Sequence, residues 1–282
     1  MKNILVPVDF SQEAYNAIEV ACALARVSNG KVLLFHVIDA PSHASSLNVV
    51  RDYSSSVQDN LYIVKLIETA KERLAEVRAD ARYAGIVLTE KVTLGNIFSS
   101  IQSEAAEKEV DMIVMGSKGT SGIDEFFIGS NTEKVVRRVK CPVLTVKQIQ
   151  EEFVFKNIVF ATNLSEDQGI VLNKLKRFQE LFGSTIHILT VITPDHFEDT
   201  KTTRKRMNDF VQKYQLENFT LNIYNSRIAE DGIIAFAEEI NADIIAMGTH
   251  GRTGIAHLIN GSIAEDVVNH AKRQVLTINM SI

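Results

Sequence analysis

The sequence predicts two tandem α/β domains, each built on a doubly wound parallel sheet of five strands. Chain length, an internal repeat and the alternation of short apolar runs with helical patterns lead to this prediction. The chain has 282 residues, and at roughly 150 residues per domain two domains are expected. Hydrophobic residues make up 45% and charged residues 23%, which excludes collagen, coiled coils and wholesale disorder.

Two segments of the chain occur twice. MKNILVPVDFS at 1–11 recurs as FKNIVFATNLS at 155–165, an offset of 154. The stretch 111–136 recurs at 243–268, an offset of 132, with 12 of 26 positions identical. Since the offsets differ by 22, the first copy carries an extra segment between its second and third strands. We place copy one at 1–147 and copy two at 155–282, with the polar link QIQEEFV between them.

Short apolar runs in each copy predict buried parallel strands, and the segments between them predict helices. In copy one the first helix is expected to be capped by Ser11 and to end at Asn29-Gly30. In sheets of this class a ligand binds beyond the carboxyl ends of the strands, where the strand order switches direction. The strand-forming runs are 4–8, 32–38, 87–93, 111–116 and 142–146 in copy one, and 158–162, 185–192, 219–224, 243–248 and 274–278 in copy two. The apolar stripe of the longer helix is Ile63, Ile67, Ala70, Leu74, Val77 and Ala81.

A glycine pattern follows the fourth strand of each copy. Gly116-x2-Gly119-x9-Gly129-Ser130 has the same spacing as Gly248-x2-Gly251-x9-Gly261-Ser262. Glycines there let the backbone approach a ligand, and the helix that follows offers free N–H groups and a positive dipole end to an anion. A triphosphate would accept hydrogen bonds from the main chain of 130–132 or 262–264.

An alternative explains part of this pattern without a ligand. Ser130-x-x-Glu133 and Ser262-x-x-Glu265 both match a capping box. A capping box accounts for the serine and the glutamate but not for three glycines at fixed spacing in both copies. The repeat shows that the spacing is constrained, by folding or by binding.

The repeated unit resembles the universal stress protein family in its tandem two-domain form. The resemblance covers nearly the whole chain and rests on VPVDFS, HVID, the MGSKG and MGTHG turns, the glycine spacing and PVLTV. It implies a Rossmann-like (HUP) fold that binds ATP or another adenine nucleotide, with or without Mg²⁺, and a role in stress survival. It also implies pairing of two units through their last strands, here within one chain as a pseudo-dimer.

The resemblance carries the nucleotide contacts first onto copy one. It places Asp9 near the ribose and adenine, Val37 beside the base, and 129–132 around the phosphates. An aspartate just before a helix is also a common cap, which is the alternative for Asp9. The copy-one contacts are Pro7, Asp9, Val37, Met115, Gly116, Lys118, Gly119, Gly129, Ser130, Asn131 and Thr132.

Copy two departs from the pattern and is ranked second. Ala161 stands in place of Pro7, Asn163 in place of Asp9, and Ala264 in place of Thr132. Arg252 adds a cation beside the turn, either for phosphate or as an ordinary surface residue. The compatible residues are Asn163, Val191, Met247, Gly248, His250, Gly251, Gly261, Ser262 and Ile263.

Composition limits the partners. A net charge of −5 argues against a dedicated nucleic-acid binder, and no apolar run is long enough to cross a membrane. Two cysteines and a start without signal-peptide anatomy favour the cytoplasm. No metal site is predicted, because the seven histidines show no zinc-binding pattern. The serine-rich stretch 41–56 either covers the first site or is a plain surface loop.

The sequence favours a nucleotide-responsive sensor or regulator over an efficient enzyme. It has no Ser-His-Asp, Walker A lysine or kinase motif, so at most slow ATP hydrolysis is expected. Two alternatives stay open: a slow ATPase, and an interaction module whose glycines serve folding only. A protein partner of unknown identity is expected, and further association of two chains into a homodimer of pseudo-dimers is left open.

Overall fold

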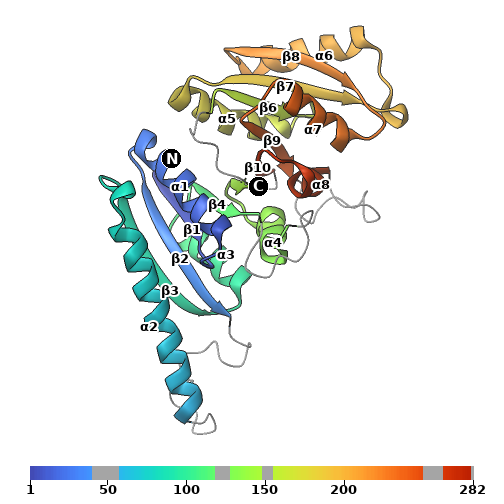
Figure 1. Ribbon diagram of the computed structural model, residues 1–282. Helices are drawn as coiled ribbons and strands as arrows, with labels where there is room; N and C mark the ends of the chain where they lie inside the picture. Colours follow the sequence, from blue (N-terminus) through green and yellow to red (C-terminus); the bar gives the residue numbers. More distant parts are fainter. Residues whose placement is uncertain (40–56, 118–127, 148–154, 250–262, 281–282) are drawn as a thin grey trace. The chain divides into compact units, whose positions relative to one another are not determined.

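The computed structural model of the chain describes residues 1–39, 57–117, 128–147, 155–249 and 263–280. It divides into two compact units, Met1–Ser121 and Gly122–Ile282, each of which is described by itself. This division differs from the repeat, because the last helix and strand of copy one belong to the second unit. All ten predicted strands are present among the described residues. Figure 1 draws the described helices and strands of both units. None of the described helices is both long and apolar enough to cross a membrane.

The first unit is a parallel sheet in the order β3-β2-β1-β4. Its strands are β1 (Asn3–Pro7), β2 (Lys31–Asp39), β3 (Val87–Gly95) and β4 (Met112–Gly116), and its helices are α1 (Gln12–Ser28), α2 (Val57–Ala79) and α3 (Ile97–Glu107). Helix α1 packs on β1, β2 and β4, while α2 and α3 pack on β2 and β3. The central run Ile4, Leu5 and Val6 is almost completely buried, as expected for a strand covered on both faces.

The two ends of α1 confirm the predicted signals. The Ser11 side chain accepts a hydrogen bond from the Ala14 N–H, and Asn29 ends the helix in the left-handed conformation at φ 50°. The predicted stripe of α2 is correct as far as Val77, but Ala81 was placed wrongly. Asp80 ends the helical run and caps a short 3-10 helix, Ala81–Tyr83, so Ala81 is exposed outside α2.

The second unit contains copy two together with the end of copy one. Its strands are β5 (Val143–Val146), β6 (Asn157–Ala161), β7 (Thr185–Ile192), β8 (Phe219–Asn225), β9 (Ile244–Thr249) and β10 (Gln274–Asn279). Its helices are α4 (Ser130–Arg138), α5 (Gln168–Phe182), α6 (Thr200–Tyr214), α7 (Ala229–Glu239) and α8 (Ile263–His270). The strand order is β5-β10-β9-β6-β7-β8, parallel throughout except for β5.

The antiparallel pair β5–β10 joins the last strands of the two copies. Leu276 is opposite Leu144, with Val275 opposite Thr145 and Thr277 opposite Val143. The last strands of the copies therefore pair within one chain, as the resemblance implied.

One aspartate in each copy joins the start of the first strand to the start of the fourth. Asp111, at the start of β4, accepts hydrogen bonds from the N–H groups of Lys2 (2.6 Å) and Asn3 (3.0 Å). Asp243 does the same for Lys156 and Asn157, at 2.8 Å each. The repeated aspartate thus fixes the first strand of each copy against the fourth.

Candidate functional site

The switch in strand direction occurs at the same place in both copies. After β1 the chain adds β2 and β3 on one side and then returns to place β4 on the other, so the switch point lies between β1 and β4. In copy two it lies between β6 and β9. The carboxyl ends of β1 and β4, and those of β6 and β9, therefore lie where such sheets bind ligands.

The loop after β1 is a tight turn built around Asp9. Its Oδ1 accepts hydrogen bonds from the Ser11 N–H (3.0 Å) and hydroxyl (2.6 Å), and Ser11 in turn caps α1. Asp9 is therefore not the helix cap itself but supports it. Between them Phe10 has φ 63°, a left-handed conformation that is costly for a bulky side chain.

Copy two repeats this turn with an amide. Oδ1 of Asn163 accepts from the Ser165 N–H (3.1 Å) and hydroxyl (2.7 Å), and Leu164 has φ 62°. Either side chain makes the turn, because the turn needs only an acceptor oxygen. The negative charge of Asp9 is therefore not a requirement of the local fold.

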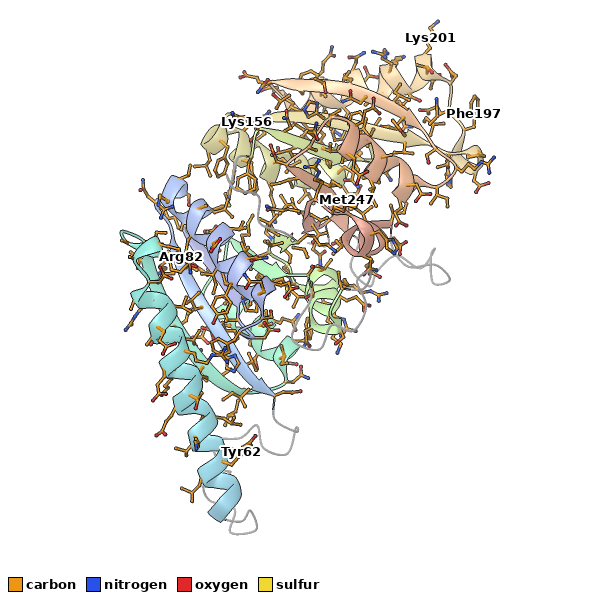
Figure 2. All side chains as sticks on the ribbon, viewed as in Figure 1. Tyr62, Arg82, Lys156, Phe197, Lys201 and Met247 are labelled. Atoms are coloured by element: carbon orange, nitrogen blue, oxygen red, sulfur yellow. The ribbon has the colours of Figure 1, made fainter. Side chains whose placement is uncertain are left out.

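The other described candidate residues of the sheet lie at or near the ends of their strands. Pro7 is the last residue of β1 and Val37 lies near the end of β2, both half-buried. Val191, the counterpart of Val37, packs against α7, where a Cβ on Gly232 would come within 2.7 Å of Val191 Cγ1. Figure 2 marks Met247 near the end of β9; like Met115 in copy one, it is 6% exposed.

The first glycine of each pattern has a packing reason. A Cβ on Gly116 would lie 2.7 Å from Glu13 Cβ and 2.9 Å from the Glu13 carbonyl carbon. A Cβ on Gly248 would lie 2.5 Å from Met280 Sδ and 3.0 Å from Gln168 Oε1. Neither glycine has a positive φ. At these two positions glycine permits close packing inside the fold.

Two buried side-chain oxygens, one on β9 and one on the first residue of α5, were not predicted from the sequence. Among the described residues, Gln168 Oε1 and Thr249 Oγ1 have no hydrogen-bond partner, and their side chains are 6% and 7% exposed. The repeat places them where copy one has Ala14 and Ser117. The repeat ends at Ser11 and Ser165, and the segments that follow share no identical residue over 12–20 and 166–174, so the sequence carries no clear signal for these oxygens.

The start of α4 does not form the expected capping box. The N-cap is Gly129, at φ −62°, and it has no side chain to offer an oxygen. Ser130 is the first helical residue and is exposed, while Asn131 is half-buried and Thr132 buried. The capping-box explanation of Ser130 is therefore wrong, because the helix begins one residue earlier than that motif requires.

The start of α8 carries more negative charge than the start of α4. Its first turn contains Glu265 and Asp266, whereas that of α4 contains only Glu133. Ile263, its first residue, is 49% exposed. Carboxylates near a helix start compete with a bound anion for the same dipole and N–H groups.

Several predicted residues fall outside the described part of the chain. They are Lys118, Gly119, His250, Gly251, Arg252, Gly261, Ser262, the capping box at Ser262 and the stretch 41–56. Of the rest, Pro7, Asp9, Val37, Met115 and Gly116 belong to the first compact unit, and Gly129 to Thr132 begin α4 of the second. The described copy-two residues all belong to the second unit.

The histidines at the strand ends bind neighbouring main-chain and side-chain atoms. His36 Nδ1 is 2.6 Å from the Val8 carbonyl oxygen, and His187 contacts Thr220 and Asn157. Across the residues that the structure describes, no three His, Cys, Asp or Glu side chains are grouped to hold a metal ion. Cys22 is buried in α1, and burial raises the pKa of its thiol to about 12.

Comparison with known proteins agrees with this architecture. A universal stress protein of Methanocaldococcus jannaschii is 32% identical over 154 residues, covering 52% of this chain and 95% of its own. One from Synechocystis is 26% identical over 98% of this chain and 99% of its own length. The crystal structure of a universal stress protein from Archaeoglobus fulgidus superposes with a TM-score of 0.78, at 24% identity, over 99% of this chain and 98% of that one.

The family model gives the same result with residue ranges. The model described as the Universal stress protein family matches residues 1–147 and again residues 155–279. Together the two matches cover nearly the whole chain, and the Synechocystis relative matches it over 99% of its own length. This chain is a tandem two-domain member of the universal stress protein family.

Proposed function

We propose that the chain binds an adenine nucleotide, with ATP as the first candidate. In this proposal its role in stress survival depends on whether the nucleotide is bound, and not on catalysis. The observation that carries this proposal is the repeated turn at the switch points. Phe10 and Leu164 hold the same left-handed conformation in both copies, between side chains that form the same hydrogen bonds. Such strain concentrates at ligand sites, and two copies that retain it favour a loop kept for binding.

Copy one is the stronger site in this proposal. The Asp9 carboxylate can accept hydrogen bonds from ribose hydroxyls, and a charged acceptor makes stronger bonds than the neutral amide of Asn163. We assign the phosphate oxygens to the main-chain N–H groups of Ser130, Asn131 and Thr132, which then donate at a helix start without a capping side chain. The acidic first turn of α8 makes copy two the weaker anion site.

The residues present fit a nucleotide better than they fit efficient hydrolysis. Main-chain amides and a carboxylate can bind the nucleotide in its ground state. Fast hydrolysis also needs a positioned water and stabilisation of the charge that develops in the transition state. Mg²⁺ would arrive with the phosphates. The loop acids Asp124 and Glu125 lie outside the described residues, so no residue is assigned to the ion.

We also propose the domain division 1–147 and 155–282, and a cytoplasmic location.

A purely structural interaction module is the second candidate. Gly116 and Gly248 favour it, because both are explained by packing against Glu13 and Met280 without any ligand. A slow ATPase is a variant of the first proposal. Multiple-turnover ADP release that disappears when Gly129 is replaced by a bulky residue would identify it.

Mass spectrometry of the ligand released from freshly purified protein tests the proposal, followed by calorimetric titration with ATP. We expect an adenine nucleotide in the released fraction, or ATP binding by the emptied protein with a preference over GTP. Empty protein that fails to bind millimolar ATP would overturn nucleotide binding and leave the interaction module.

A further inference from the structure

The β5–β10 strand pair, which joins the two copies, has nearly two-fold symmetry. At an offset of 132, Leu144 corresponds to Leu276, and these two residues are opposite each other at the centre of the β5–β10 pair. The pairs on either side, Val275–Thr145 and Thr277–Val143, are each other's counterparts. Helices α4 and α8, which begin at the predicted phosphate positions, pack against each other beside this pair.

One position breaks this symmetry. Arg137 on α4 lies 3.3 Å, Nε to Oε1, from Glu265 of α8, whose side chain is 13% exposed. The counterpart of Arg137 is Asn269, and the mirrored contact would run from Asn269 to Glu133. Instead, Asn269 Oδ1 accepts a hydrogen bond from the Ile128 N–H at 3.0 Å.

Ile128 directly precedes the N-cap of α4. Because that N-cap is Gly129, which has no side chain, a main-chain contact at Ile128 helps set how the first N–H groups of α4 point. The main-chain oxygen of Asn269 also accepts a hydrogen bond from Lys147 Nζ at 3.0 Å, just after β5. At the other end of α4, Asn279 Nδ2 donates to the Val139 carbonyl oxygen at 3.4 Å. Side chains of copy two thus hold both ends of a copy-one helix.

We propose that Asn269 is a positioning residue through which the second copy sets the phosphate-binding main chain of the first. The inference rests on the proposed function, since it concerns the N–H groups assigned there to phosphate. Asn269 touches no ligand in this proposal; it acts through Ile128. Its effect should therefore fall on phosphates and not on the nucleoside.

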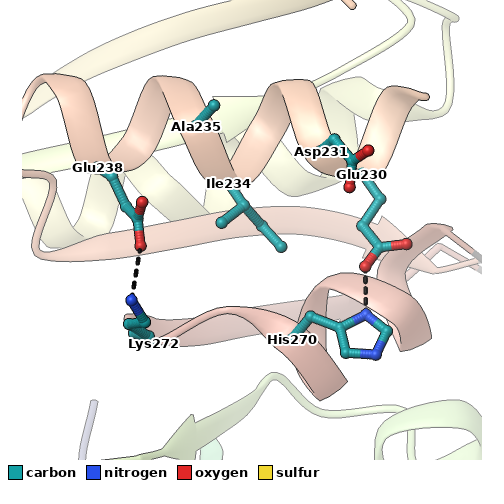
Figure 3. Close-up of a pocket in the computed structure, with 7 residues that line it drawn as sticks. All are labelled: Glu230, Asp231, Ile234, Ala235, Glu238, His270 and Lys272. Carbon is teal, nitrogen blue, oxygen red and sulfur yellow. Dashed lines mark hydrogen bonds and ion pairs between the residues drawn. The ribbon is translucent and has the colours of Figure 1, made fainter. Parts of the chain in front are cut away.

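The neighbouring residue on α8 provides a matched control. His270 is the next residue of α8, and its Nδ1 contacts Glu230 of α7 (Figure 3). This contact borders a groove of about 500 Å³ between α7 and the end of α8, crossed also by the Lys272–Glu238 ion pair at 3.7 Å. Replacing His270 perturbs the same helix end without touching Ile128.

The test is calorimetric titration of the full chain with ATP and with adenosine, for wild type and for Asn269→Ala, Asn269→Gln and His270→Ala. Loss of one hydrogen bond predicts that Asn269→Ala weakens ATP binding about threefold to tenfold and leaves adenosine unchanged. Asn269→Gln, which keeps a neutral amide oxygen, should stay within about twofold of wild type. His270→Ala should bind both ligands as wild type does.

The outcomes separate this inference from the proposed function. Wild type that binds no ATP overturns both. Wild type that binds ATP, with Asn269→Ala unchanged or weakened equally for adenosine, overturns the role of Asn269 alone. If Asn269→Ala does not fold, Asn269→Ser takes its place, because a serine side chain is too short to reach the Ile128 N–H. Amide exchange at Ile128, measured by NMR, should then be faster than in wild type, and an unchanged rate counts against the contact.

Discussion

The third strand and the helix after it are built on different chemistry in the two copies. In copy one, Lys91 on β3 forms an ion pair with Glu104 on α3, whose side chain is only 4% exposed. The repeat places Ile223 and Phe236 at the same two positions of copy two, and Phe236 packs edge-on against Tyr224 at 6.0 Å. This place is therefore filled by an ion pair in copy one and by apolar and aromatic side chains in copy two.

The two solutions should respond differently to a single change. A buried carboxylate that loses its cation leaves an uncompensated charge, whereas an apolar side chain exchanged for another of similar volume disturbs only its packing. Glu104 Oε1 already has no hydrogen-bond partner among the described residues, so Lys91 is its main compensation. Copy one is thus the more vulnerable of the two at this position.

The largest expected effect follows from Lys91→Met. It should lower the free energy of unfolding by about 3 kcal/mol, near the lower end for broken buried pairs because the lysine is itself partly exposed. Urea denaturation followed by circular dichroism at 222 nm measures this. The matched change in copy two, Ile223→Met, should cost less than about 1.5 kcal/mol.

The double variant Lys91→Met/Glu104→Leu sharpens the comparison. Since it removes both charges and keeps the volume, it should regain most of the stability that Lys91→Met loses. A double variant no more stable than the single one would show that the copies do not tolerate the same chemistry here.

The second effect compares Gly116 with Gly248. A methyl group on Gly116 meets the main chain of Glu13, which cannot move without shifting α1, whereas one on Gly248 meets mainly the flexible end of Met280. We expect Gly116→Ala to destabilise by about 2 kcal/mol and Gly248→Ala by less than about 1 kcal/mol. Thermal unfolding of both variants checks this. Equal losses would mean that Met280 is held as rigidly as the main chain.

The third effect exchanges the turn residues between the copies. Asp9→Asn should weaken ATP binding about tenfold, the loss of one charge-assisted acceptor, while the turn itself stays formed. Asn163→Asp should strengthen ATP binding by copy two. The gain should be smaller than the loss in Asp9→Asn, because the first turn of α8 contains two carboxylates. Calorimetry of both variants measures this. Tighter ATP binding by Asp9→Asn would reverse the ranking of the two sites.

Most of the fold could be predicted because its signals are local and repeated. Runs such as Ile4–Val6 and Ile158–Phe160 mark buried strands by composition alone, and the repeat fixes their order. The sequence led us to expect a ligand at the switch point, and the observed strand order places that point between β1 and β4, beside Asp9 and Gly116. These inferences needed no knowledge of side-chain contacts.

The unpredicted features depend on contacts between distant segments. Nothing near Asn269 in the sequence indicates that it binds the Ile128 N–H, 141 residues away. The packing role of Gly116 depends on Glu13, which is distant in the sequence. Helix α4 begins at Ser130 and not at the next residue, and the sequence pattern could not resolve a difference of one residue. Sequence patterns located the candidate site, but they could not separate ligand-binding glycines from glycines required by packing.

The smallest expected effect concerns His187, whose counterpart in copy one is Leu33. Its Nε2 donates to Asn157 Oδ1 at 3.1 Å and its Nδ1 is 2.8 Å from Thr220 Oγ1, an arrangement that suits the neutral ring. Burial holds the pKa of His187 below its ordinary value of 6.5.

On unfolding at low pH, His187 therefore takes up a proton that the folded state binds less well, which favours the unfolded state. The stability that it contributes should be present above about pH 6.5 and decline as the pH falls below that value. His187→Leu restores the copy-one residue and removes this proton uptake. Urea denaturation of both proteins between about pH 5 and pH 8 should show a shallower loss toward acid for the variant. Parallel curves would mean that the ring titrates alike in both states, and that this difference between the copies has no pH-dependent consequence.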